Sequence, residues 1–154
     1  MHQKQKQTIL SMVKADYENK NFLNKYLVLY TEFLDVEEPF TDFNCERGEG
    51  KAQYISLIEQ LMCKDKNAKV FVEVYGFEEE SEDTWIYADT LIIISQLPLR
   101  DIEQVFNSSK DVFPSEISGI NDLEERYLVI DEGIKHSVNK FYKKGMNVYY
   151  CWWD

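Results

Sequence analysis

Residues Asp83 to Gln96 read D-T-W-I-Y-A-D-T-L-I-I-I-S-Q, and this stretch decides the fold. It is the longest run in the chain that is rich in β-branched and aromatic residues, the types that favour strands. Its second half, Leu91 to Ile94, is apolar at every position, which a strand tolerates only when both of its faces are covered. The stretch therefore predicts the central strand of a sheet.

The segments around this strand predict its neighbours in the sheet. Residues 69–77 alternate, with Val70, Val72 and Val74 on one side and Phe71, Glu73 and Tyr75 on the other. The acidic run 78–83 then forms a solvated turn, so 69–77 and 84–95 make a hairpin. Residues 126–131 and the terminal run 146–153 are two further strand candidates.

Apolar periodicity of about 3.6 residues predicts the helices. The helical segments are 3–18, 22–35, 51–63 and 99–107. In the second of them Phe22, Tyr26, Tyr30 and Phe33 share one stripe, and the segment contains no turn signal, so we favour a helix. Two alternatives stay open: residues 26–30 alone fit a strand, and 3–35 fit one long helix kinked near 19–21.

Three further segments give weaker signals. Residues 36–50 contain Pro39, Gly48 and Gly50 and read as a loop that Phe40 and Phe43 pin to the core. Residues 113–117 fit a turn or a short helix, and 119–125 are polar and irregular. Residues 133–144 fit either a helix or a strand. The fold expected is α+β, with a mixed or mainly antiparallel sheet of about four to five strands and three to four helices in a single domain, 1–154.

Charge excludes several classes of partner. The 154-residue chain has 28 acidic and 17 basic residues, a net charge of −11. A nucleic-acid binder needs a basic footprint, and so does a protein that binds an anionic membrane, so we expect neither. No run reaches the roughly 18 apolar residues of a membrane span. The three cysteines, Cys45, Cys63 and Cys151, form no C-x-x-C pair, which favours reduced thiols and a cytoplasmic location.

The sequence contains no motif for catalysis, metal or cofactor. Only His2 and His136 are present, so a zinc site of ordinary spacing cannot be drawn. His136 stands among Lys135, Lys140, Lys143 and Lys144, the one basic patch, without an acid or nucleophile spaced beside it. Cys45 lacks a paired histidine. We therefore expect no catalytic residues, no metal and no cofactor, and the balance is against an enzyme.

Aspartate and aromatic residues on the strands are the candidates for binding. Under strict alternation Asp89 shares a face with Trp85, Tyr87, Leu91 and Ile93, where it is either a pocket acid or a solvent-facing group. Trp152 and Trp153 point to opposite faces of the last strand, so both cannot enter one core. If helices cover only one face, the other carries exposed aromatic side chains. The candidate binding residues are Trp85, Tyr87, Asp89, Tyr149, Tyr150, Trp152, Trp153, Glu78, Glu79 and Glu80.

Three functions fit these features. The first is a non-catalytic, acidic domain that binds a basic protein. In size, charge and lack of catalytic motifs it is similar to the immunity proteins that bacteria make against their own toxins, which implies an inhibitor of a basic toxin or nuclease in a bacterial cytoplasm. The second is a small-ligand-binding protein or enzyme with a pocket around Asp89. The third is a structural homodimer that pairs through a terminal edge strand.

Overall fold

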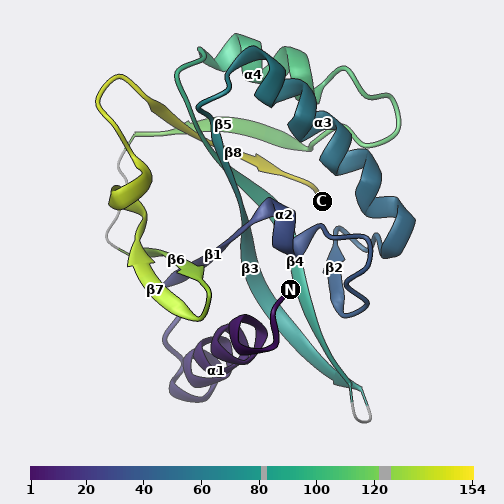
Figure 1. Ribbon diagram of the computed structural model, residues 1–154, viewed down its shortest axis with the longest axis vertical. Helices are drawn as coiled ribbons and strands as arrows, with labels where there is room; N and C mark the ends of the chain where they lie inside the picture. The colour runs from purple at the N-terminus through teal and green to yellow at the C-terminus, as the bar shows by residue number, and fades with distance from the viewer. Residues whose placement is uncertain (81–82, 122–125) are drawn as a thin grey trace.

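A single mixed sheet organises the molecule (Figure 1). The computed structural model describes residues 1–80, 83–121 and 126–154, and these residues form eight strands and four α-helices. The strands are β1 Lys25–Leu29, β2 Thr41–Phe43, β3 Lys69–Glu80, β4 Asp83–Ser95, β5 Glu116–Ile120, β6 Tyr127–Asp131, β7 Ile134–Ser137 and β8 Asn147–Trp152. The helices are α1 Gln3–Asn19, α2 Tyr30–Phe33, α3 Lys51–Lys64 and α4 Leu99–Phe106, with short 3-10 turns η1 Gly48–Gly50 and η2 Val138–Phe141.

The sheet order is β5-β8-β4-β3-β1-β6-β7, and β2 also pairs with β4. The β1–β6 and β2–β4 pairs are parallel, and the others are antiparallel. Two strands share one edge of β4, because β2 pairs with Ile86 to Ala88 and β8 with Thr90 to Ser95. The α+β class and the mixed sheet are confirmed, but the expected strand number of four to five is wrong.

The stretch Asp83–Ser95 is the central strand, as the sequence predicts. Leu91, Ile92, Ile93 and Ile94 are all at most 1% exposed, and β3 and β8 flank them. Leu91 and Ile93 contact the core beneath the helices. Ile92 and Ile94 belong to a second cluster on the other face, where Val138 and Met146 lie instead of an α-helix.

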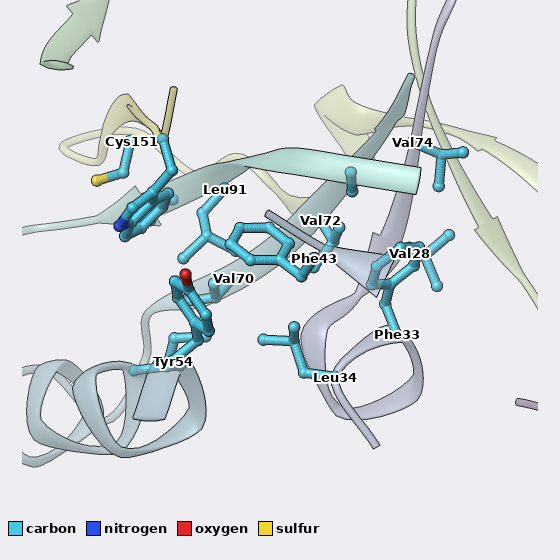
Figure 2. Packing of buried hydrophobic residues seen from close by; sticks show 14 of the residues in the cluster. Val28, Phe33, Leu34, Phe43, Tyr54, Val70, Val72, Val74, Leu91 and Cys151 are labelled. Atoms are coloured by element: carbon cyan, nitrogen blue, oxygen red, sulfur yellow. The ribbon is translucent and has the colours of Figure 1, made fainter. Parts of the chain in front are cut away.

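All four helices pack against one face of the sheet, which we call the helix face. Its core joins residues of α1, α2, α3 and α4 to Val28, Val72, Leu91 and Cys151 of four different strands. Figure 2 shows these strand residues pointing into the same layer as Phe33, Leu34, Phe43 and Tyr54. A helix packed on a sheet needs only one apolar stripe, and the periodicity of α1, α3 and α4 supplied it.

The segment 22–35 is not the helix that its apolar stripe favours. Residues 25–29 are β1, and only 30–33 are helical, so the alternative of a strand at 26–30 is the one observed. Tyr26, Leu27 and Val28 are buried in succession between β3 and β6, whereas Phe22 and Leu23 are 63% and 67% exposed. Pairing on both sides decided the structure, and no local signal distinguishes so short an apolar run.

Three other strands lie where the sequence indicated loops or ambiguity. β2 is inside the expected loop 36–50, and β5 begins inside the expected turn at 113–117. The ambiguous segment 133–144 contains β7 and then η2. The irregular segment expected at 119–125 partly overlaps β5, and its residues 122–125 lie outside the described part of the chain. These strands are short, and β2 has only three residues, so their partners rather than their own pattern hold them. No described helix is long and apolar enough to cross a membrane.

Candidate binding surface

Two β-bulges interrupt the pairing of β3 with β4. Glu73 pairs with Thr90 and Val74 with Ala88, so Asp89 is an extra residue on β4. Gly76 pairs with Tyr87, so Tyr75 is an extra residue on β3. The first bulge lies where the other neighbour of β4 changes from β2 to β8, and there the Asp89 carbonyl accepts from Trp153 N–H at 2.9 Å. Bulges are common next to functional sites because they redirect side chains.

The bulge at Asp89 overturns the strict alternation expected along β4. Ile86 and Ala88 point to the helix face, and so do Leu91 and Ile93, because the extra residue shifts the phase by one. Trp85 and Tyr87 consequently lie on the opposite face from Leu91 and Ile93, and the prediction that all share one face with Asp89 is wrong. A bulge leaves no mark in the sequence pattern of this strand.

Asp89 itself is half-buried rather than enclosed. Its Oδ1 accepts a hydrogen bond from Thr90 Oγ1 at 2.8 Å. A cavity of about 160 Å³ lies nearby and is lined by Glu73 and Tyr75, but Asp89 does not line it. The structure therefore places a pocket next to the predicted residue and not around it.

Five aromatic side chains lie on the face of β3, β4 and β8 that the helices leave uncovered, and we call them the aromatic surface. They are Tyr75, Trp85, Tyr87, Tyr150 and Trp152. Tyr75 is 54% exposed, and its ring stacks on Tyr87 with centroids 6.4 Å apart. Sequence reasoning did not select Tyr75, although its alternation with Val72 and Val74 was the available signal.

Carboxylates hold the tyrosine hydroxyls of the aromatic surface. Tyr87 OH donates to Glu78 Oε2 at 2.5 Å, and Tyr150 OH donates to Glu116 Oε1 at 2.6 Å. The bond to Glu116 and partial burial raise the pKa of Tyr150. Glu116 was not among the predicted residues, because β5 was not recognised as a strand. Each hydrogen bond adds to the packing that holds its ring in place.

Trp85, at the hairpin end of the aromatic surface, is half-buried. The guanidinium of Arg47 lies 3.9 Å from its ring centroid, and Arg47 Nε donates to Asp42 Oδ2 at 3.1 Å. Phe40 meets the same indole edge to face at 5.4 Å. The loop that carries β2 therefore supports Trp85 from one side.

Trp152 and Trp153 lie on opposite faces of the sheet, as predicted from their adjacent positions. Trp153 is 3% exposed and packs on the helix face against Phe43, Tyr54 and Phe106. Trp152 is half-buried on the aromatic surface, in register with Thr90. Tyr149 belongs to the helix-face core, where its hydroxyl donates to Leu97 O at 2.5 Å. Trp153 and Tyr149 thus lie away from the other predicted site residues.

The three predicted glutamates of the hairpin do not act as one group. Glu78 pairs in register with Trp85 and lies on the side of the aromatic surface. Glu79 forms an ion pair with Lys14 of α1 on the helix side. The backbone of Glu80 pairs with Asp83, and its side chain lies outside the described part of the structure.

Glu73 is a buried carboxyl group that sequence reasoning did not single out. Its side chain is 15% exposed, and Lys25 Nζ lies 3.5 Å from its Oε2. Burial raises the pKa of Glu73, and Lys25 opposes that shift. The 160 Å³ cavity beside it is also lined by Asp16, Tyr17 and Phe22. Asp16 Oδ2 accepts from Tyr26 OH at 2.6 Å, and burial with this bond raises the pKa of Tyr26 to about 12.

The other candidate groups form no catalytic arrangement in the described residues. His136 lies on β7 opposite Val129. Cys45 and Cys63 are exposed, and burial raises the pKa of the Cys151 thiol. Among the residues described, no group of three or more His, Cys, Asp or Glu is placed to hold a metal ion. The last strand, β8, lies between β4 and β5, so the edges of the described sheet that a homodimer could use are β5 and β7.

Comparisons with known proteins give no family for this chain. A scan against family models, a search of curated proteins and a search of solved structures each return no match.

Proposed function

We propose that the protein binds a basic protein partner through the aromatic surface and does not act as an enzyme. The observation that carries this proposal is a sheet face without α-helices, on which two half-exposed tyrosines, Tyr87 and Tyr150, are held by carboxylates. The biological setting that fits best is an immunity or antitoxin protein that masks a basic toxin or nuclease. We place it in a bacterial cytoplasm, which the three cysteines without disulfides support.

The residue types of the aromatic surface suit an interface. Tyrosine and tryptophan dominate the binding energy of many protein interfaces, because they bury a large area and have few rotatable bonds. Tyr87 and Tyr150 are already fixed by Glu78 and Glu116 in the free protein. Binding therefore costs these rings less conformational entropy than it costs a free side chain.

The charge around the surface favours a basic partner. Glu78, Glu116 and Asp89 accompany the aromatic rings, while the nearby cations Lys25 and Arg47 are paired with Glu73 and Asp42. With a net charge of −11 the whole molecule attracts a basic protein at long range. Complementary charge of this kind raises the association rate and excludes acidic competitors.

The cavity beside Glu73 gives the partner an anchor point. Its volume of about 160 Å³ is close to that of cavities that hold a benzene-sized group. Its wall combines the rings of Tyr17, Phe22 and Tyr75 with the carboxylates of Asp16 and Glu73 and with Lys25, which is paired with Glu73. Aromatic rings next to carboxylates attract a cation, so a lysine or arginine side chain of the partner fits here.

An affinity capture from the source cell tests the proposal. The bait is the purified protein, and the comparison is a Tyr87→Ala/Trp152→Ala double variant. A partner with net positive charge is expected, and each truncation should weaken its binding about 30-fold, as for an interface hot spot. A Phe113→Ala/Tyr142→Ala double variant is the matched control, because both residues are exposed aromatics outside the aromatic surface. Recovery of only neutral or acidic partners, or equal binding by all variants, contradicts the proposal.

A charge reversal separates the role of the carboxylates from that of the rings. Glu78→Lys/Glu116→Lys should slow association with the partner, and the difference should shrink as salt is added. Glu18→Lys/Glu59→Lys changes the net charge equally at two exposed positions elsewhere. An equal effect of the two double variants would show that only total charge matters.

A small cationic ligand in the Glu73 cavity is the second candidate function, and the buried carboxyl group favours it. Titration with arginine methyl ester tests it directly. Binding that is lost in Glu73→Gln and unchanged in Tyr87→Ala/Trp152→Ala supports a small-ligand site. The absence of binding leaves the cavity as an anchor for a protein side chain only.

A further inference from the structure

Four lysines from two distant segments surround one cavity of about 300 Å³. Lys66 and Lys69 flank the start of β3, and Lys143 and Lys144 lie in the turn between η2 and β8. The remaining lining residues are Asn67, Gln96, Phe141 and Met146. No carboxylate of the described residues lines the cavity. The sequence shows Lys143 and Lys144 as part of a basic patch, but only the fold adds Lys66 and Lys69 to it.

The charge of this cavity is exceptional for the molecule. Acids outnumber bases by 28 to 17 in the chain, and Lys14, Lys25 and Arg47 each pair with a carboxylate. None of the four cavity lysines forms an ion pair within the described part of the chain. Four like charges at one cavity repel one another, and a bound anion relieves that repulsion.

The backbone that carries the lysines is held in place. Asp65 accepts hydrogen bonds from Ser95 Oγ at 2.7 Å and from the N–H groups of Gln96 and Asn67 at 3.0 Å. These bonds fasten the turn before β3 to the end of β4. They also occupy both oxygens of Asp65, which is 8% exposed and does not line the cavity. The wall that carries Lys66 and Lys69 therefore does not have to be ordered by a ligand.

The floor of the cavity is apolar and equally well held. Phe141 packs edge to face on Phe71 with centroids 5.4 Å apart, and Met146 is buried. Asn67 and Gln96 add amide groups at the rim. A cavity of this size with an apolar floor and a few convergent polar groups has the build of a small-molecule site.

We propose that this cavity binds a small molecule that carries two or more phosphate groups. Lysine is a common phosphate ligand, acting as a point charge with three N–H donors. One phosphate monoester carries about −1.5 to −2 charges at pH 7, so four lysines match two phosphate groups. The aromatic floor of Phe141 suits a flat organic group attached to them, which makes a nucleoside diphosphate the natural probe.

The four-lysine cavity lies far from the acidic tip of the β3–β4 hairpin. Lys69 begins β3, and the acidic tip follows its other end at Glu80. Twelve strand residues place the two about 36 Å apart. Figure 1 shows the hairpin of β3 and β4 projecting away from the end of the sheet where α4 follows β4. None of the residues that line the cavity belongs to the aromatic surface, so the binding of a phosphate compound can be tested separately from the proposed partner.

Calorimetric titration of the purified protein at low ionic strength tests the proposal. The probes are ADP, pyrophosphate and adenosine. ADP and pyrophosphate should bind and adenosine should not. Lys69→Gln/Lys143→Gln should weaken ADP binding about a hundredfold, because each charged hydrogen bond is worth about tenfold. Lys110→Gln/Lys135→Gln removes the same charge at two exposed lysines outside the cavity and should change the affinity less than twofold.

Three results overturn the proposal. The first is no binding of ADP or pyrophosphate by the wild-type protein. The second is an equal loss of affinity in both double variants, which reduces the effect to net charge. The third is salt-sensitive self-association in sedimentation that both Lys69→Gln/Lys143→Gln and Glu78→Gln/Asp83→Asn abolish. That result assigns the cavity to the acidic hairpin of a second copy.

Discussion

Two buried polar side chains, Gln5 and Lys51, hydrogen-bond helices to loops and turns elsewhere in the chain. Gln5 of α1 is fully buried, and its amide donates to Ile130 O at 2.5 Å and accepts from Gly133 N–H at 2.6 Å. It thereby docks the first helix on the turn between β6 and β7. Lys51 makes the corresponding link between α3 and the loop before β2. A buried polar residue with all of its partners specifies one arrangement of the elements that it joins.

Lys51 offers a direct measurement of such a link. Its Nζ donates to Glu38 O at 3.0 Å, to Asp35 O at 3.3 Å and to Thr41 Oγ1 at 2.5 Å. Lys51→Met removes three hydrogen bonds and leaves Glu38 O without its donor, which should lower the free energy of unfolding by about 2 to 4 kcal/mol. Burial lowers the pKa of Lys51, so the charged group itself carries a desolvation cost that methionine removes. Urea denaturation measures the difference.

Lys64→Met is the control for Lys51→Met, since Lys64 is exposed in the last turn of the same helix. Its effect should stay within about 0.5 kcal/mol. Equal effects of the two substitutions would mean that the three hydrogen bonds of Lys51 contribute nothing net.

Glu73 should make the folded state less stable as pH rises, whereas an acid with a lowered pKa makes it more stable. Because burial raises its pKa, the folded state holds the proton at pH values where the unfolded state has lost it. Stability from this group is present below the ordinary glutamate pKa of about 4.3 and is lost as pH rises through the raised value. Glu73→Gln should therefore be more stable relative to the wild type at pH 7 than at pH 4, as measured by the difference between their urea midpoints. If the midpoint of Glu73→Gln at pH 7 is lower than that of the wild type, the ion pair with Lys25 outweighs the cost of burial.

At the scale of an element, β8 shows how one strand serves two surfaces. Trp153 sits in an aromatic cluster, and its Nε1 donates to Val112 O at 3.0 Å. Trp153→Ala should lower the free energy of unfolding by about 3 to 5 kcal/mol, because it opens a cavity and orphans that carbonyl. Trp152→Ala should cost less than about 1.5 kcal/mol, since its ring is half-exposed. Circular dichroism in urea compares them, and equal losses would contradict the assignment of the two faces.

The strand β4 makes a prediction for amide exchange. The amides of Leu91 to Ile94 are hydrogen-bonded within a sheet flanked by β3 and β8, with apolar side chains on both faces. They should exchange only through global unfolding and be among the slowest in the chain. The amides of 22–24, which lie in the exposed segment before β1, provide the contrast. Fast exchange at 91–94 would contradict the layered structure.

At the scale of the whole molecule, charge is segregated. The acidic hairpin and the four-lysine cavity lie at opposite ends of β3, and the net charge is −11. Few exposed ion pairs offset the repulsion, among them Lys14–Glu79 and Arg100–Asp101. Self-repulsion of this kind destabilises the compact state, and salt screens it.

Added sodium chloride should therefore raise the urea midpoint at pH 7. A Glu18→Gln/Glu59→Gln variant, which removes two exposed acids, should show a smaller rise. A midpoint that falls with salt would indicate that attractive ion pairs outweigh the net repulsion.

The sequence by itself determined the parts whose signal is local. Hydrophobic period identified α1, α3 and α4, and β-branched runs identified β3, β4, β6 and β8. Adjacent positions alone required Trp152 and Trp153 to separate. These inferences hold because a long periodic run satisfies its own backbone and needs from the rest of the chain only an apolar surface.

Only the tertiary structure decided the rest. β1, β2 and β5 are strands because neighbours pair with them, and their own patterns also suit a helix or a loop. The bulge at Asp89 arises where β4 exchanges one neighbour for another, and it moved Trp85 and Tyr87 to the face opposite Leu91. The four-lysine cavity joins residues more than seventy positions apart. Pairing partners and long-range contacts carry no local periodicity, so residue patterns cannot reveal them.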